Sequence, residues 1–196
     1  QPPLESRCKF YALIEVDMEN QDSEEKLLSC FEQAFAEGWI VDGVMSSSDA
    51  QAEALWKLRE GISEAITPWT PYKNDISVTI SNVAAFLESV ETKVGEAYPG
   101  FENIWFGHIG DGNLHLNILK PESMDIEMFK DKCTSFSDII YTEVAEFDGS
   151  ISAEHGIGLL KKEFLHHSCS EAEINIKKGI KKLFDPDNVL NPGKIF

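Results

Sequence analysis

Two histidines flank a glycine-containing stretch that reads His108-Ile109-Gly110-Asp111-Gly112-Asn113-Leu114-His115. Asp-Gly favours a two-residue type I′ turn, because both central residues of that turn need a positive φ. A hairpin centred on Asp111 and Gly112 pairs His108 with His115, whose Cβ atoms would lie about 4.5–5.5 Å apart on one face. Side chains alternate between the faces of a strand, so Asn117 should share this face. The pattern predicts half of a metal site, or alternatively a tight turn with two partly exposed histidines.

A second cluster reads Ser152-Ala153-Glu154-His155-Gly156-Ile157-Gly158. Two histidines and one carboxylate form a three-ligand metal set that leaves coordination positions open for a substrate. If the chain returns to the hairpin, Glu154 completes that set. His155 then stays unligated, and a histidine is suited to proton transfer near neutral pH. The alternative is a helix N-terminus that Ser152 caps and where Glu154 offsets the helix dipole.

Two basic residues are candidates for binding an anion. Arg59 follows Leu55 by four residues, which places it beside the apolar stripe of a predicted helix rather than opposite it. An inward-leaning arginine needs an anion, which is either an internal Asp or Glu or a substrate carboxylate held by two-point contact. Lys73 precedes a predicted strand, where it either supplies a second positive charge or is an ordinary flanking lysine.

The elements that position these residues follow from the periodicity of the apolar side chains. Helical spacing predicts helices over 24–37, 49–66, 83–98 and 126–147, and a last one around 176–184. Alternation predicts strands over 11–16, 39–45, 75–80, 104–108 and 114–119. This order predicts an α+β fold, a ferredoxin-like plait with a largely antiparallel sheet and a small C-terminal helical subdomain. We expect a substrate-binding cap subdomain over 1–152 and the helical subdomain over 153–196.

Composition limits the classes of function. The 196 residues include 17 basic and 34 acidic side chains, and the net charge of −17 disfavours binding to nucleic acid or to anionic membranes. The four cysteines form no CxxC pair, which favours free thiols in a reducing intracellular compartment. The chain starts without Met and without a signal-peptide pattern, so we expect it to begin inside a longer precursor.

Three motifs in this order resemble a known family. They are the hairpin stretch from Gly107 to His115, the cluster from Ala153 to Gly158, and the closing Phe184-Asp185-Pro186 with Leu190-Asn191-Pro192-Gly193-Lys194. They are similar to the C-terminal half of FAD-linked 2-hydroxyacid dehydrogenases, the D-lactate, glycolate and D-2-hydroxyglutarate enzymes of the vanillyl-alcohol-oxidase superfamily. Leu55-Trp56-Lys57-Leu58-Arg59 and Tyr72-Lys73-Asn74-Asp75 resemble the D-2-hydroxyglutarate branch most. The resemblance covers essentially the whole chain.

The resemblance implies roles for individual residues. His108, His115 and Glu154 match positions that bind a divalent metal, usually zinc. His155 matches the base, and Asn191 matches a position beside the flavin. Positions that hold the substrate's carboxylates are matched by Arg59, Ser63, Lys73 and Asn117. Ser63 stands where the closest relatives have threonine, a change that keeps the hydroxyl and removes a methyl group.

The resemblance also implies cofactors and partners. The expected reaction oxidises a D-2-hydroxyacid by metal-assisted hydride transfer to FAD. FAD would be bound mainly by an N-terminal domain that this chain lacks, and no GxGxxG motif replaces it. We therefore expect a fragment that is inactive alone. The expected partners are the N-terminal FAD-binding domain, an electron acceptor such as a flavoprotein or quinone, and a second copy of the chain. The expected location is the mitochondrial matrix or the bacterial cytoplasm.

Two other classes of function fit the same residues. A metal-dependent hydrolase would use an ion at His108, His115 and Glu154 to activate water. A non-catalytic fragment would bind a metal or an anion without turnover. Detection of a flavin in the parent protein would distinguish the dehydrogenase from both alternatives.

Overall fold

The structure is a computed structural model that describes residues 3–18 and 21–196. Contacts between Cα atoms divide the chain into two compact units, Gln1–Ala65 and Ile66–Phe196. The separate helical subdomain expected from residue 153 onward stays a prediction. No helix among the described residues is long and apolar enough to cross a membrane.

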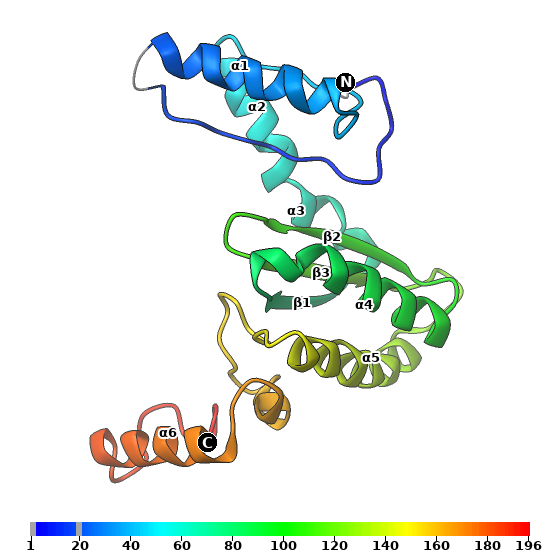
Figure 1. The fold of residues 1–196 in the computed structure, drawn as a ribbon. Helices are drawn as coiled ribbons and strands as arrows, with labels where there is room; N and C mark the ends of the chain where they lie inside the picture. Colours follow the sequence, from blue (N-terminus) through cyan, green and yellow to red (C-terminus); the bar gives the residue numbers. More distant parts are fainter. Residues whose placement is uncertain (1–2, 19–20) are drawn as a thin grey trace. The chain divides into compact units, whose positions relative to one another are not determined.

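The first unit is helical, with α1 (Gln21–Ala36), α2 (Asp49–Glu60) and α3 (Ile62–Ala65) (Figure 1). The helices expected over 24–37 and 49–66 are confirmed, although the second is interrupted at Gly61. The strands expected over 11–16 and 39–45 are wrong, because these segments are fully described and contain no strand. Ile14 and Trp39 are 74% and 73% exposed, so the alternating apolar side chains have no sheet beneath them.

The second unit confirms the predicted α+β class. It contains a three-stranded antiparallel sheet with the order β1-β3-β2 (Figure 1). Its strands are β1 (Tyr72–Ser77), β2 (Glu102–His108) and β3 (Asn113–Leu119). Its α-helices are α4 (Val83–Ala97), α5 (Ile126–Glu146) and α6 (Glu171–Phe184). Short 3-10 helices are η1 (Thr67–Trp69), η2 (Ile80–Asn82) and η3 (Lys162–His167).

The two faces of this sheet differ in chemistry. Helices α4 and α5 cover one face, where the core includes fully buried Ile76 and Leu116 from the strands. Phe86 of α4 and Phe136 of α5 pack into the same core. Because side chains alternate along a strand, the register places a different set of residues on the opposite face. This second set, which we call the polar face, includes Lys73, Asp75, Phe106, His108, Asn113, His115 and Asn117.

The register of the β2–β3 hairpin corrects the predicted pairing of the two histidines. His115 lies opposite Phe106, and His108 lies opposite Asn113, so the connecting loop covers residues 109–112. Gly112 has a φ of 75°, but Asp111 does not have the second positive φ that a type I′ turn requires. The Asp111 Oδ1 atom instead accepts the N–H of Asn113 at 3.0 Å. Because the shift is two residues, both histidines still belong to the polar face.

Helix α6 ends the second unit with an unusual distribution of apolar side chains. Its start is fixed by a capping box between Ser170 and Glu173. The expected apolar stripe is present on this helix, but the relative exposure of its side chains is 53–78%. The stripe consists of Ile176, Ile180, Leu183 and Phe184.

Candidate metal and substrate site

Asp75 is a buried carboxylate of the polar face, on the edge strand β1. Its position on β1 is directly opposite His115 on β3, and its side chain is only 3% exposed. The Oδ2 atom accepts the backbone N–H of Glu154 at 3.0 Å and that of His155 at 2.9 Å. The Ser152 hydroxyl donates to the same oxygen at 3.2 Å. Because hydrogen bonds to a charged acceptor contribute about 1.5–3 kcal/mol each, this carboxylate fixes the 152–155 segment on the sheet.

The environment of Asp75 keeps its carboxylate ionised. Burial alone raises the pKa of Asp75, because a charge is poorly solvated there. The N–H groups of His155 and Glu154 and the positive charge of Lys161 outweigh this effect and hold the pKa below its ordinary value. The polar face therefore has a buried negative charge next to two imidazoles.

The 150–155 segment is attached to the sheet by several further bonds. Ser150 forms an antiparallel bridge with Ser77 at the end of β1. The Lys161 ammonium donates to the carbonyl oxygens of Asp75 at 2.8 Å and Ile151 at 2.6 Å. The segment that carries Glu154 therefore lies against the sheet, which is the condition on which the predicted ligand set depends. The alternative, a helix that begins at Ser152, is wrong, because residues 152–158 are described and are not helical.

His115 and Glu154 come together beside Asp75. One ligand atom from each of the three residues lies within 4.8 Å of the other two. The Asn113 side-chain amide donates to the Glu154 carboxylate and holds it against the hairpin. The His115 ring lies 6.1 Å from the His155 ring, centroid to centroid. The structure therefore brings together a predicted metal-ligand pair and the predicted base.

The remaining predicted residues of the second unit occupy different parts of the polar face or lie outside it. His108 is the exposed last residue of β2 and does not belong to the close ligand group of the described residues. Lys73 is exposed and lies opposite Asn117 in the β1–β3 register. Asn117 is buried. Asn191 is exposed beyond α6, with a left-handed φ of 47°.

Arg59 and Ser63 belong to the first unit. Arg59 is half-buried in the last turn of α2, and Ser63 is half-buried in α3, four residues further on. Their assignment to the substrate's carboxylates stays a prediction.

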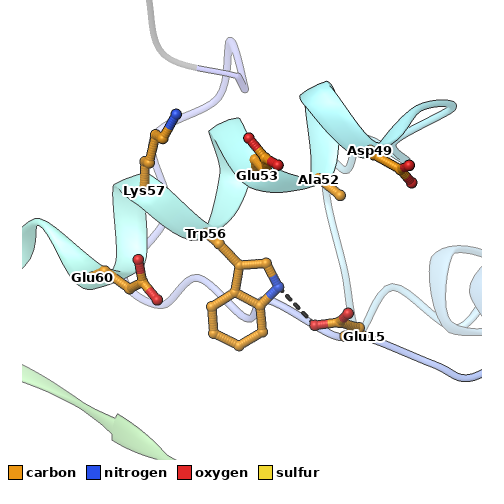
Figure 2. Close-up of a pocket in the computed structure, with 7 residues that line it drawn as sticks. All are labelled: Glu15, Asp49, Ala52, Glu53, Trp56, Lys57 and Glu60. Atoms are coloured by element: carbon orange, nitrogen blue, oxygen red, sulfur yellow. Dashed lines mark hydrogen bonds between the residues drawn. The ribbon is translucent and has the colours of Figure 1, made fainter.

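A shallow pocket in the first unit is chemically different from the predicted substrate site. Figure 2 shows Trp56 at its centre, and the indole Nε1 donates to the Glu15 carboxylate at 2.7 Å. Four carboxylates and one lysine line the pocket, so its charge would repel a 2-hydroxyacid anion. None of the predicted site residues lines it. The lining residues are Glu15, Asp49, Ala52, Glu53, Trp56, Lys57 and Glu60.

The polar face fits a divalent metal and a polar ligand. Imidazole nitrogen and carboxylate oxygen are donors that zinc and related ions accept. The buried Oδ1 atom of Asn113 and the buried Nδ2 atom of Asn117 have no hydrogen-bond partner among the described residues. Buried polar atoms are normally paired, so these two atoms could pair with a bound group, although Asn74 and Asn103 on the opposite face also have unpaired buried atoms among the described residues.

Comparison with known proteins assigns the chain to a family. It belongs to the family of FAD linked oxidases, C-terminal domain, which matches residues 2–195. It is 53% identical over 194 residues to D-2-hydroxyglutarate dehydrogenase of Stutzerimonas stutzeri, covering 99% of this chain and 42% of that protein. It is 46% identical over 196 residues to D-2-hydroxyglutarate dehydrogenase of Xanthomonas citri, covering 100% of this chain and 42% of that protein. The chain thus spans less than half of these relatives, and the resemblance seen in its motifs is confirmed.

Three residues of the site were not predicted: Asp75, Asn113 and Lys161. Asp75 follows Lys73 by two residues on β1, so the two side chains share a face, and this alternation is the local signal that could have indicated it. Its partners are separated from it by 77–86 residues along the chain. A local pattern cannot reveal such pairings, because they depend on the register of the sheet and on the path of the 150–161 segment.

Proposed function

We propose that this chain is the substrate- and metal-binding C-terminal part of an FAD-dependent enzyme that oxidises a D-2-hydroxyacid to the 2-oxoacid. D-2-hydroxyglutarate is the first candidate substrate and D-lactate the second. The observation that carries the proposal is the convergence of His115, Glu154 and His155 around Asp75 in a chain of this family. The names of the relatives support the same substrate class.

His108, His115 and Glu154 would hold a divalent metal, zinc in the first instance. When bound, the metal lowers the pKa of a substrate hydroxyl and the flavin accepts the hydride from the α-carbon. His155 accepts the hydroxyl proton, because its ring is 68% exposed next to His115 and is open to a substrate. The Asp75 Oδ2 atom lies 3.8 Å from Nδ1 of His155, so the buried carboxylate faces the proposed base.

The substrate is held by the rest of the polar face. Lys73 and Asn117 are opposed on neighbouring strands, and we assign their ammonium and amide groups to one anionic ligand. The unsatisfied Nδ2 atom of Asn117 would donate to a carboxylate oxygen. Arg59 and Ser63 would supply a guanidinium and a hydroxyl to the substrate's carboxylates. Fixing the acid in this way raises the rate of the chemical step by orientation.

The proposed flavin-binding part of the parent protein would cover surface that is exposed in this chain. Soluble proteins rarely expose a large contiguous apolar patch. The exposed apolar stripe of α6 is therefore a candidate for the surface that this part covers. Asn191, a few residues beyond α6, would lie beside the flavin. A flavoprotein or quinone would re-oxidise the flavin, and a second copy of the chain is a candidate partner. The proposed location is intracellular, in the mitochondrial matrix or the bacterial cytoplasm.

The test uses the full-length protein that contains this chain. The purified protein is mixed without oxygen with D-2-hydroxyglutarate or D-lactate, and flavin absorbance is followed. We expect rapid bleaching with a D-2-hydroxyacid and none with its L-enantiomer. His155→Asn should slow bleaching by about 10²–10⁴-fold, because general-base catalysis contributes about that much.

The control is His166→Asn, which changes an exposed histidine on η3 that contacts the Glu163 carbonyl. This variant should bleach at the wild-type rate. A parent protein that contains no flavin, or whose flavin stays oxidised with every 2-hydroxyacid, would overturn the proposal and favour the metal-dependent hydrolase.

A further inference from the structure

We propose that Asp75 is a positioning residue that orients the metal ligand His115 and the backbone of Glu154 and His155 as one unit. This role rests on the proposed function, because it concerns the same metal and the same base. It assigns to Asp75 a task different from that of the proposed ligands His115 and Glu154.

The first part of the argument concerns His115. The Asp75 Oδ1 atom lies 3.8 Å from Nδ1 of His115, and the two residues are directly opposed in the sheet. A metal-binding histidine usually directs its second ring nitrogen to a carboxylate, which fixes the tautomer and the ring orientation. In the proposed arrangement Asp75 therefore faces Nδ1, and Nε2 is the nitrogen assigned to the metal. On its other side the ring is limited by Phe106, whose centroid lies 5.0 Å away.

The second part concerns the segment that carries Glu154 and His155. Their two backbone N–H groups and the Ser152 hydroxyl all donate to Oδ2 of Asp75. These bonds hold the backbone of Glu154 and His155 in place and so determine the directions of their side chains. Because Oδ2 already accepts these three hydrogen bonds, it has little capacity left for a metal, whereas Oδ1 accepts only the Glu154 N–H, at 3.3 Å. We therefore assign the positioning role to Oδ2, and the test below separates this role from that of a metal ligand.

The third part is the rigidity of Asp75 itself. The side chain is 3% exposed in the middle of the register between β1 and β3. Lys161 donates to the backbone oxygens of Asp75 and Ile151, so it joins β1 directly to the segment that Asp75 holds. The backbone of Asp75 and the segment that its carboxylate binds are therefore held together by Lys161 as well.

The test measures metal binding in the full-length protein after its metal has been removed by a chelator. Cobalt(II) is titrated into wild type, Asp75→Asn and His115→Ala, and the visible cobalt bands report the ligands. We expect Asp75→Asn to bind cobalt about 10- to 100-fold more weakly, the usual effect of removing a ligand's carboxylate partner. At saturation its band positions should equal those of wild type, because no ligand has been lost. His115→Ala should change the bands.

Glu143→Gln is the matched control, because Glu143 is also a fully buried carboxylate and bonds to Lys93 and Ser89 away from the polar face. It should lower stability without weakening cobalt binding. Altered bands in saturated Asp75→Asn would make Asp75 a ligand and overturn the proposal. Wild-type affinity in Asp75→Asn would overturn it as well, while the metal site would stand. A wild-type protein that binds no cobalt would overturn both.

Discussion

Gly112 has no side chain at a point where the loop between β2 and β3 passes very close to the backbone of Val78. A Cβ atom at this position would lie 1.9 Å from the Val78 carbonyl oxygen, and the φ of 75° is unfavourable for other residues. The Gly112 carbonyl also accepts the Val78 N–H at 3.2 Å. We expect Gly112→Ala to lower the free energy of unfolding by about 1–3 kcal/mol through backbone strain, with the steric contact adding to this loss.

Urea unfolding of the 196-residue chain checks this expectation, and Gly110→Ala in the same loop is the control. Gly110 has no positive φ, and a Cβ atom there meets nothing within 4 Å. The Gly110 variant should unfold at nearly the wild-type urea concentration. Equal losses in both variants would show that the close approach to Val78 does not constrain the loop.

At the same scale, sequence identified some of the polar residues but not how they pair. The residue types in the two glycine-containing motifs suggested that His115 and Glu154 could meet, on the condition that the second motif returns to the hairpin. The position of His108 relative to His115 was predicted incorrectly, because the type of turn depends on a side-chain bond of Asp111 as well as on the Asp-Gly pair. Asp75 was missed because its donors belong to a distant segment.

Helices α4 and α5 are joined by an ionic contact whose contribution depends on pH. Burial alone raises the pKa of Glu143, but hydrogen bonds from Lys93 and Ser89 outweigh it and lower the pKa below its ordinary value. The folded state therefore binds the Glu143 proton less tightly than the unfolded state does. This contribution to stability is complete above the ordinary carboxyl pKa, about 4.3, and is lost as the pH falls through the lower folded pKa.

We expect Glu143→Gln to flatten the fall in stability below pH 5, because glutamine does not titrate. The urea midpoint of the chain, measured between pH 3 and pH 7, gives the slope for wild type and variant. Glu146→Gln removes a more exposed partner of Lys93, 3.4 Å away, and should leave the slope close to that of wild type. If the urea midpoint of Glu143→Gln falls with pH as steeply as that of wild type, carboxylates other than Glu143 cause the loss of stability in acid.

Helices were predicted more reliably than strands in this chain. The helices α1, α4 and α5 each have an apolar stripe at helical spacing, which is a local property of the sequence. The alternation over 11–16 is equally local, but a strand needs a neighbouring strand to satisfy its backbone, and none of the described segments pairs with it. The periodicity could therefore predict the α+β class but not the number of strands.

The two units of the chain differ in how much apolar surface they bury. None of the described residues in 3–18 and 22–65 is buried, whereas the core of the second unit contains fully buried residues from β1, β3, α4 and α5. Local opening costs less where few apolar side chains are buried. We expect backbone amides of α1 and α2 to exchange with deuterium much faster than those of β3 and α5 in the 196-residue chain.

Hydrogen exchange followed by mass spectrometry of peptides gives this comparison within one sample. The amides of α6 are an internal control, because that helix lies in the second unit and yet has no buried residue of its own. They should exchange nearly as fast as those of α1. Protection of α1 equal to that of β3 would show that the first unit is stabilised by contacts other than burial of its own side chains.

The bridge between Ser77 and Ser150 has a consequence for the order in which the molecule acquires its site. Asp75 and Glu154 are 79 residues apart along the chain, and Asn113 and Glu154 are 41 residues apart. Contacts over such separations form after local helices, because a long loop must close before they contribute free energy. On a ribosome, Asp75 and His115 emerge well before their partners at 150–155. We therefore expect the proposed metal to bind only after residues 150–155 have been synthesised and have packed on the sheet.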